Sequence, residues 1–299
     1  MILPEWSNSL LNKINSLRKD PKVSKILHII SIIYPLALIY FSKNEILKLE
    51  WGRFFGIFLS CFLIYYVSMA LQNIAWSLLV DRNFTNFWFN SKVYFQTVLM
   101  KRLPGGVWHW LGRASLYDAQ VDDERNSIRR ANLTEWLLLI LSGLSGYAFT
   151  VNLWLGSISL ILTIGTGFSL VNRENHSWVR SLLLSTILTV TYAICWLVGA
   201  LILHRLLLSV NPSGNVAFNS SFGIWCLSSA TGMFFFFPSG ALIRDFSLSA
   251  LLSKQYEPAK FLLIILQVRI IFLVADLLWS FFSLQFIKLI KSKPTSKAN

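Results

Sequence analysis

Long apolar runs separated by short polar or basic stretches dominate this chain. A transmembrane helix needs about 20 mainly apolar residues, and seven runs approach or exceed that length. The seven runs are 26–41, 54–80, 133–150, 153–171, 181–210, 222–237 and 261–286. The pattern predicts an all-α fold, a polytopic membrane helical bundle.

Two segments, 103–113 and 237–245, interrupt the apolar pattern with proline and small residues. Proline removes a helical N–H and disfavours helix at the preceding residue. At membrane depth the released backbone groups have no water to bond, so such a break persists only inside protein or beside a wet cavity. The first break separates a predicted half-helix over 87–103 from a short helix over 107–117. We therefore expect two Pro/Gly-broken re-entrant segments.

The composition excludes a water-soluble globule. Hydrophobic residues make up 55% of the 299 residues, only 14% are charged, and the mean hydropathy is +0.56. We expect three parts: a basic interfacial N-terminal helix at 1–25, a single transmembrane domain at 26–288 and a basic cytoplasmic tail at 289–299.

The net charge of +13 fits the excess of Lys and Arg found on the cytoplasmic side of membrane proteins. Both ends are basic, which predicts a cytoplasmic location for both and an even number of crossings. Seven is an odd number, so one break-containing segment is expected to complete an eighth crossing. This gives about 7–8 transmembrane helices. The basic residues lie beside apolar runs without a nucleic-acid motif, so no nucleic acid is expected as a partner.

Cysteine and histidine do not form a recognisable site. The three cysteines lie in apolar runs without C-x-x-C spacing, and the four histidines are scattered. Neither a disulfide framework nor a metal site is predicted. No cofactor is expected.

Arginine at membrane depth is costly unless it snorkels, pairs or faces water. One hypothesis is snorkelling; the other is a phosphate clamp, because a guanidinium binds phosphate with two parallel hydrogen bonds and a helix N-terminus after a break offers free N–H groups. The candidate residues for binding a lipid phosphate are Arg102, Gly105, Gly106, Trp108, Arg113, Gly240 and Arg244.

The last apolar run contains Arg269 and Asp276, which lie seven residues apart and so on one helix face. Two turns are too far for a direct contact within the helix. Structural pairing with Asp245, Glu135 or a carbonyl is one interpretation, and a proton-coupling role for Asp276 is the other. We therefore group Asp245, Arg269 and Asp276 as a coupling group or a structural ion pair.

The sequence offers little support for catalysis. The acidic cluster at 118–124 is flanked by arginines and is typical of a solvated loop, and there is no P-loop or nucleophile–base pair. An enzyme of glycosyl or lipid transfer that uses this loop remains an alternative.

The two breaks carry a family resemblance. Residues 104–108, Pro-Gly-Gly-Val-Trp, followed by Gly112-Arg113, resemble the Pro-Gly-x-x-Trp and Gly-Arg motifs of the flippase-like membrane family related to the transmembrane domain of lysylphosphatidylglycerol synthases. Pro238-x-Gly240 with Arg244-Asp245 is similar to that family's Pro-Gly-Gly and Arg-Glu motifs. Here Ser239 replaces a glycine and Asp245 replaces the glutamate.

The resemblance implies a helical bundle that moves anionic phospholipids or lipid-linked sugars between leaflets, in a bacterial inner membrane and beside proteins of polysaccharide biosynthesis. Larger relatives carry a soluble aminoacyl-transferase domain that this chain lacks, so lysyl transfer is not expected. The rivals are the transfer enzyme and a non-transporting scaffold of a polysaccharide assembly complex. Since both breaks repeat the same order of elements, we also expect them to form one site, with facing tips.

Overall fold

A computed structural model describes residues 39–44, 46–47, 51–81, 84–102, 108–118, 125–172, 177–210, 216–234, 240–253 and 255–292. Within these ranges the regular structure is entirely helical, which confirms the all-α prediction for this part of the chain. The predicted interfacial helix at 1–25, most of the run 26–41 and residues 293–299 of the tail lie outside the described residues.

Five of the described helices are long and apolar enough to cross a membrane, so this is an integral membrane protein. They are α3 (Trp51–Val80), α6 (Arg125–Val151), α7 (Leu153–Val171), α8 (Trp178–Val210) and α11 (Pro258–Ser292). Helix α6 begins eight residues before its apolar run, because its first turns are amphipathic: Ile128 is buried while Arg129 and Arg130 are exposed. Helix α11 continues past the predicted domain limit at 288.

The two interrupted segments form pairs of short helices. Around the first break, α4 (Phe87–Val98) continues as a 3-10 turn, η1 (Leu99–Arg102), and is followed by α5 (Trp108–Asp118), within one residue of the predicted ranges. Around the second lie α9 (Phe218–Phe234) and α10 (Gly240–Leu252). The break residues 103–107 and 235–239 lie outside the described residues.

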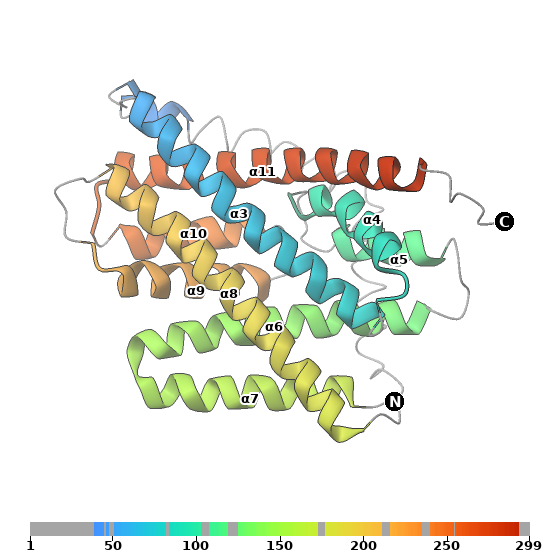
Figure 1. The fold of residues 1–299 in the computed structure, drawn as a ribbon. Helices are drawn as coiled ribbons and strands as arrows, with labels where there is room; N and C mark the ends of the chain where they lie inside the picture. The colour runs from blue at the N-terminus through green and yellow to red at the C-terminus, as the bar shows by residue number, and fades with distance from the viewer. Residues whose placement is uncertain are drawn as a thin grey trace, which may run out of the picture.

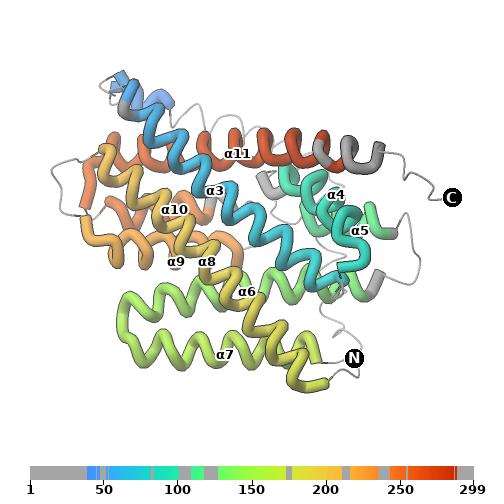
Figure 2. Tube along the Cα trace, in the orientation of Figure 1, coloured from blue at the N-terminus to red at the C-terminus, as the bar shows by residue number. Residues whose placement is uncertain are grey.

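The two pairs of short helices occupy opposite ends of the bundle (Figure 1). Helices α4 and α5 lie at the right of the view, beside the end of α3 and the start of α6, whereas α9 and α10 lie at the left, beside the end of α8 and the start of α11. The tube in Figure 2 shows that each pair runs into the bundle and returns to the end from which it came. Helix α11 packs against α4 and η1 as well as α10, so it bridges the two pairs.

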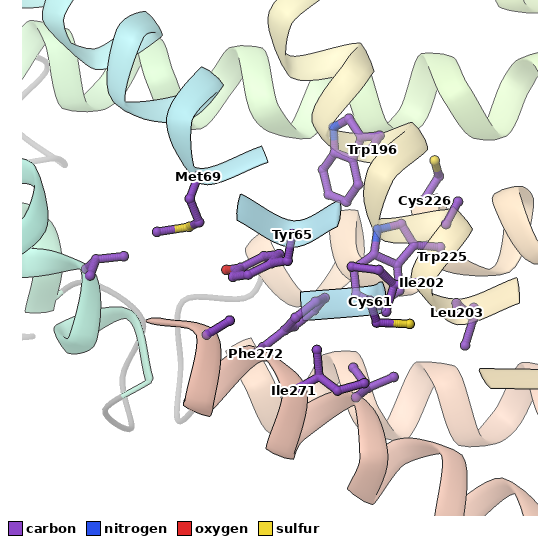
Figure 3. Packing of buried hydrophobic residues seen from close by; sticks show 14 of the residues in the cluster. Cys61, Tyr65, Met69, Trp196, Ile202, Leu203, Trp225, Cys226, Ile271 and Phe272 are labelled. Atoms are coloured by element: carbon purple, nitrogen blue, oxygen red, sulfur yellow. The ribbon is translucent and has the colours of Figure 1, made fainter. Parts of the chain in front are cut away.

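Large aromatic and aliphatic side chains from α3, α8, α9 and α11 fill the centre (Figure 3). Tyr65 and Phe272 stack with ring centroids 4.6 Å apart, and Trp225 meets Phe272 edge-on at 5.5 Å. On the outside, by contrast, Trp154, Ile161 and other large apolar residues of α7 are well exposed. An apolar outer surface is costly in water but suits a helix that faces lipid.

Small residues set the closest helix contacts. Gly199 of α8 lies directly beneath the indole of Trp225 on α9, where an added Cβ would overlap the ring. Gly143 of α6 accommodates Trp196 of α8 in the same way. Within the α6–α7 pair, the hydroxyl of Ser145 contacts Ser159 on α7 at 2.8 Å. Small and hydroxylated residues are the usual means of close packing between membrane helices.

Candidate functional site

The first candidate site is centred on Arg113, whose side chain is fully buried. Helix α5 points Arg113 toward Glu135 of α6, and its Nη1 donates a hydrogen bond to a Glu135 carboxylate oxygen. The guanidinium carbon lies 4.0 Å from the ring centroid of Trp76 on α3 and 4.9 Å from that of Tyr94 on α4. We call these four residues the Arg113 cluster.

The geometry of the Arg113 cluster excludes snorkelling for this arginine. A long cation that snorkels places its charge in the headgroup region, whereas the Arg113 guanidinium lies between helices with 0% exposure. Glu135, 2% exposed, supplies the opposite charge, and the two ring faces add cation–π attraction. Nε and Nη2 of Arg113 are also buried, and neither has a hydrogen-bond partner in the described part of the chain.

Polar side chains surround this cluster. The Tyr94 hydroxyl donates to Oε1 of Gln72 at 3.1 Å, and Nδ2 of Asn73 donates to the Ser91 hydroxyl at 3.0 Å. Both bonds join α3 to α4. Such bonds fix α4 against a long helix even though α4 itself has only 12 residues.

The second candidate site is centred on Asp245 of α10, which is 0% exposed. One carboxylate oxygen accepts hydrogen bonds from Nε and Nη2 of Arg244 at 3.2 and 3.1 Å. The other accepts from Nε of Arg269 on α11, which confirms the predicted pairing of Arg269 with Asp245. The Arg244 guanidinium also lies 5.8 Å from the Trp225 ring and 5.9 Å from the Phe272 ring. We call Arg244, Asp245 and Arg269 the Asp245 cluster.

Tyr65 of α3 packs against α11 beside the Asp245 cluster. Its hydroxyl donates to Asp276 at 2.9 Å, and its ring stacks on Phe272, which faces Arg244. Farther along α11, the Ser280 hydroxyl donates to the backbone carbonyl of Phe95, the neighbour of Tyr94 on α4, at 2.8 Å. Along α11, contacts of Arg269, Phe272, Asp276 and Ser280 thus lead from the Asp245 cluster, past Tyr65 of α3, to α4.

The remaining predicted site residues have these positions. Arg102 ends η1, Trp108 begins α5 and Gly240 begins α10, but their side chains lie outside what the structure describes, as do Gly105 and Gly106 entirely. The two arginines of the family motifs bind different carboxylates. Helix α5 packs on α4, η1 and α6, and α10 packs on α9 and α11. That both breaks form one site therefore stays a prediction.

Several residues of these clusters were not singled out from the sequence. In the sequence, Trp76, Tyr94 and Tyr65 resemble ordinary core or interfacial aromatic residues. Glu135 was considered only as a possible partner for the charged residues of the last apolar run. One signal was present: Gln72 and Asn73 form an adjacent amide pair inside the apolar run 54–80. Polar residues inside a membrane helix usually face protein or a cavity, so that pair marks the face of α3 that carries Trp76.

The described residues hold no group of three or more His, Cys, Asp or Glu side chains that could bind a metal ion. Of the acidic stretch 118–124, only the backbone of Asp118, at the end of α5, is described. A transfer enzyme that uses this stretch thus stays an untested alternative. No family model, no curated protein and no solved structure matches this chain.

Proposed function

We propose that this protein is a lipid translocator that moves an anionic phospholipid or a lipid-linked sugar between the leaflets of a bacterial inner membrane. The observation that carries the proposal is Arg113: a fully buried guanidinium with one nitrogen on Glu135 and two N–H-bearing nitrogens without a described partner. Buried charges among membrane helices are costly and commonly mark a substrate or ion pathway.

The lengths of the short helices support two re-entrant hairpins. At about 1.5 Å per residue, the 13 residues of α10 extend about 20 Å, short of the hydrocarbon core of about 30 Å. The 12 residues of α4 extend less. We propose that the α9–α10 pair enters and leaves on one side and that the run 222–237 is one arm of this hairpin. The five long helices and the run 26–41 then make six crossings. Six is an even number, so both ends lie on the cytoplasmic side and no eighth crossing is needed.

Between the two hairpins lie three crossings, α6, α7 and α8. Because three is odd, the α4–α5 hairpin and the α9–α10 hairpin enter from opposite leaflets. The positive-inside rule places the α4–α5 side, with Arg129, Arg130 and the basic end of α11, in the cytoplasm. Broken helices that meet near the bilayer midplane are a recurrent design of transporter sites.

This arrangement suggests how a charged headgroup crosses. The phosphate exchanges between the Arg113 cluster, reached from the cytoplasmic leaflet, and the Asp245 cluster, reached from the outer leaflet, while the hydrocarbon chains stay in lipid. Tyr65, Phe272 and Asp276 lie along the path on α11 from the Asp245 cluster to α4. The motif resemblance at 104–113 and 238–245 supports the same function, and proteins of polysaccharide biosynthesis are the candidate partners.

The test uses the purified full chain in liposomes that contain fluorescent phosphatidylglycerol or a fluorescent polyprenyl-phosphate sugar. An impermeant quencher bleaches only the outer leaflet of empty liposomes, about half of the signal; a translocator raises the bleached fraction. We expect Arg244→Ala to abolish the rise and Arg205→Ala, at an exposed position of α8, to retain it. A folded protein that moves neither probe would favour the scaffold alternative.

A further inference from the structure

Neutral polar atoms without partners gather beside Arg113. The buried atoms that lack a hydrogen-bond partner in the described structure include Asn73 Oδ1, Trp76 Nε1, Ser77 Oγ and Asn90 Nδ2. Burying a polar group without a partner is costly, and native proteins keep few of them. Several in one place therefore point to a ligand that completes their hydrogen bonds.

The contacts of these residues place them together. Asn73, Trp76 and Ser77 are spaced i, i+3 and i+4 and so share one face of α3. Opposite that face, Asn73 bonds to Ser91 of α4, whose neighbour is Asn90.

From Asn90 the contacts return to the arginine. Asn90 Oδ1 accepts a 2.7 Å hydrogen bond from the Tyr117 hydroxyl of α5. The Tyr117 ring lies 6.3 Å from the ring of Trp76, and Trp76 in turn covers the guanidinium of Arg113. The unpaired atoms thus belong to side chains of α3 and α4 that are linked to one another and to Tyr117 and Arg113 of α5.

The chemistry of this set differs from that of a plain phosphate site. It offers donors at Trp76 and Asn90, an acceptor at Asn73 and both at Ser77, all without charge, next to aromatic ring faces. A phosphate oxygen can only accept and a hydrocarbon chain can do neither. A sugar ring carries hydroxyls that both donate and accept, and its C–H faces pack against aromatic rings. The unpaired N–H groups of Arg113 lie alongside, where a phosphate bound to that sugar would accept from them.

We propose that α3, α4 and α5 form a sugar subsite beside Arg113, so that the substrate is a lipid-linked sugar whose phosphate binds Arg113. This inference rests on the proposed function, because it names the substrate class of the same site. The sugar lies against Trp76, with Asn73, Ser77 and Asn90 bonding its hydroxyls. All of these atoms are buried, so loading requires the α4–α5 hairpin to move away from α3.

The experiment measures binding rather than transport. The full chain in detergent is titrated with three probes by native mass spectrometry: a polyprenyl phosphate, the same lipid carrying one hexose, and phosphatidylglycerol. The hexose-bearing probe is expected to bind about tenfold more tightly than the bare polyprenyl phosphate, from a few added hydrogen bonds between uncharged groups.

Two variants delete one unpaired atom each. Trp76→Phe removes the indole N–H and keeps a ring over Arg113, and Ser77→Ala removes the hydroxyl. Each is expected to weaken the hexose-bearing probe about three- to tenfold more than the bare polyprenyl phosphate. The matched controls are Trp279→Phe and Ser181→Ala, which delete the same kinds of unpaired buried atom outside this set and should change neither probe.

Equal affinity of wild type for the two polyprenyl probes, or tighter binding of phosphatidylglycerol, would overturn the sugar subsite. So would Trp76→Phe and Ser77→Ala variants that weaken both polyprenyl probes equally. These results are independent of translocation. If the protein prefers the hexose probe but moves no lipid in liposomes, the sugar subsite stands and the proposed function is wrong. If it moves lipid without preferring the hexose probe, the proposed function stands and the sugar subsite is wrong.

Discussion

Arg113 and Asp245 are both buried charged residues, and their charges are compensated by different partners. Arg113 has one carboxylate, Glu135, and two aromatic faces, so its pair is electrically neutral. Asp245 is shared by two arginines, Arg244 and Arg269. An anion that approaches the Asp245 cluster meets two guanidinium groups around one carboxylate. At Arg113 it must use the two remaining guanidinium nitrogens, Nε and Nη2.

Separating structure from function at Arg113 requires a paired substitution. Arg113→Leu leaves Glu135 buried without its cation and should lower the free energy of unfolding by about 3–5 kcal/mol. Arg113→Leu/Glu135→Leu removes both charges and should regain most of that stability, but not transport. Thermal unfolding in detergent and the liposome assay measure the two effects. Wild-type transport by the double variant would make the pair structural only.

The shared carboxylate predicts unequal effects within the Asp245 cluster. Asp245→Asn leaves two arginines without their carboxylate and should lower Tm markedly. Arg269→Gln should lower it less, because Arg244 still holds Asp245. The comparison is Lys260→Ala, whose 3.6 Å pair with Glu257 lies at the surface and should be worth at most about 1 kcal/mol. If Arg269→Gln proves as harmful as Asp245→Asn, Arg244 is not an effective second partner.

At the scale of the elements, local chemistry in the sequence predicted more than the contacts between helices. Pro104 and Pro238 mark both pairs of short helices, and α7 has the predicted bounds because Asn152 caps it through a 2.8 Å bond to the Trp154 N–H. Which helix face meets which neighbour was not predictable. Gly143, for example, faces Trp196 of α8, and periodicity is weak in a helix that is apolar all round.

The α8–α9 contact gives a prediction for an element. Gly199→Ala would push its methyl group into the Trp225 indole and should cost about 1–3 kcal/mol by overpacking. Because Trp225 also borders Arg244, transport should fall as well. Gly165→Ala on α7 is the matched control, since nothing lies within 4 Å of the added Cβ. This variant should change neither stability nor transport. Equal Tm shifts for the two variants would show that the contact adapts freely.

At the scale of the whole molecule, the sequence predicted a helical membrane bundle, which the five long apolar helices support, whereas the number of crossings and the role of the run 222–237 stay predictions. Hydropathy alone cannot tell a crossing from one arm of a hairpin, because both arms are apolar. The relation between the Arg113 cluster and the Asp245 cluster was also hidden. It depends on α3 and α11, which are remote in sequence and meet through Tyr65 and Asp276.

Topology can be tested at four exposed turn positions. Single cysteines at Thr85 and Ser177 should be protected from an impermeant thiol reagent in intact cells, whereas cysteines at Asn152 and Gln255 should react. The native Cys61, Cys195 and Cys226 are buried and contribute little background. Labelling of all four positions after permeabilisation is the control for access. Reaction at Ser177 but not Asn152 in intact cells would reverse the orientation.

The proposed entry of the two hairpins from opposite leaflets would also have a pharmacological consequence. A peptide or antibody fragment that cannot cross the membrane would meet only the α9–α10 hairpin, with Arg244 close behind it. The Arg113 side would be open only to molecules that have already entered the cell. Inhibitors of the two kinds would therefore trap the protein in different states, and resistance substitutions against each should fall in different halves of the chain.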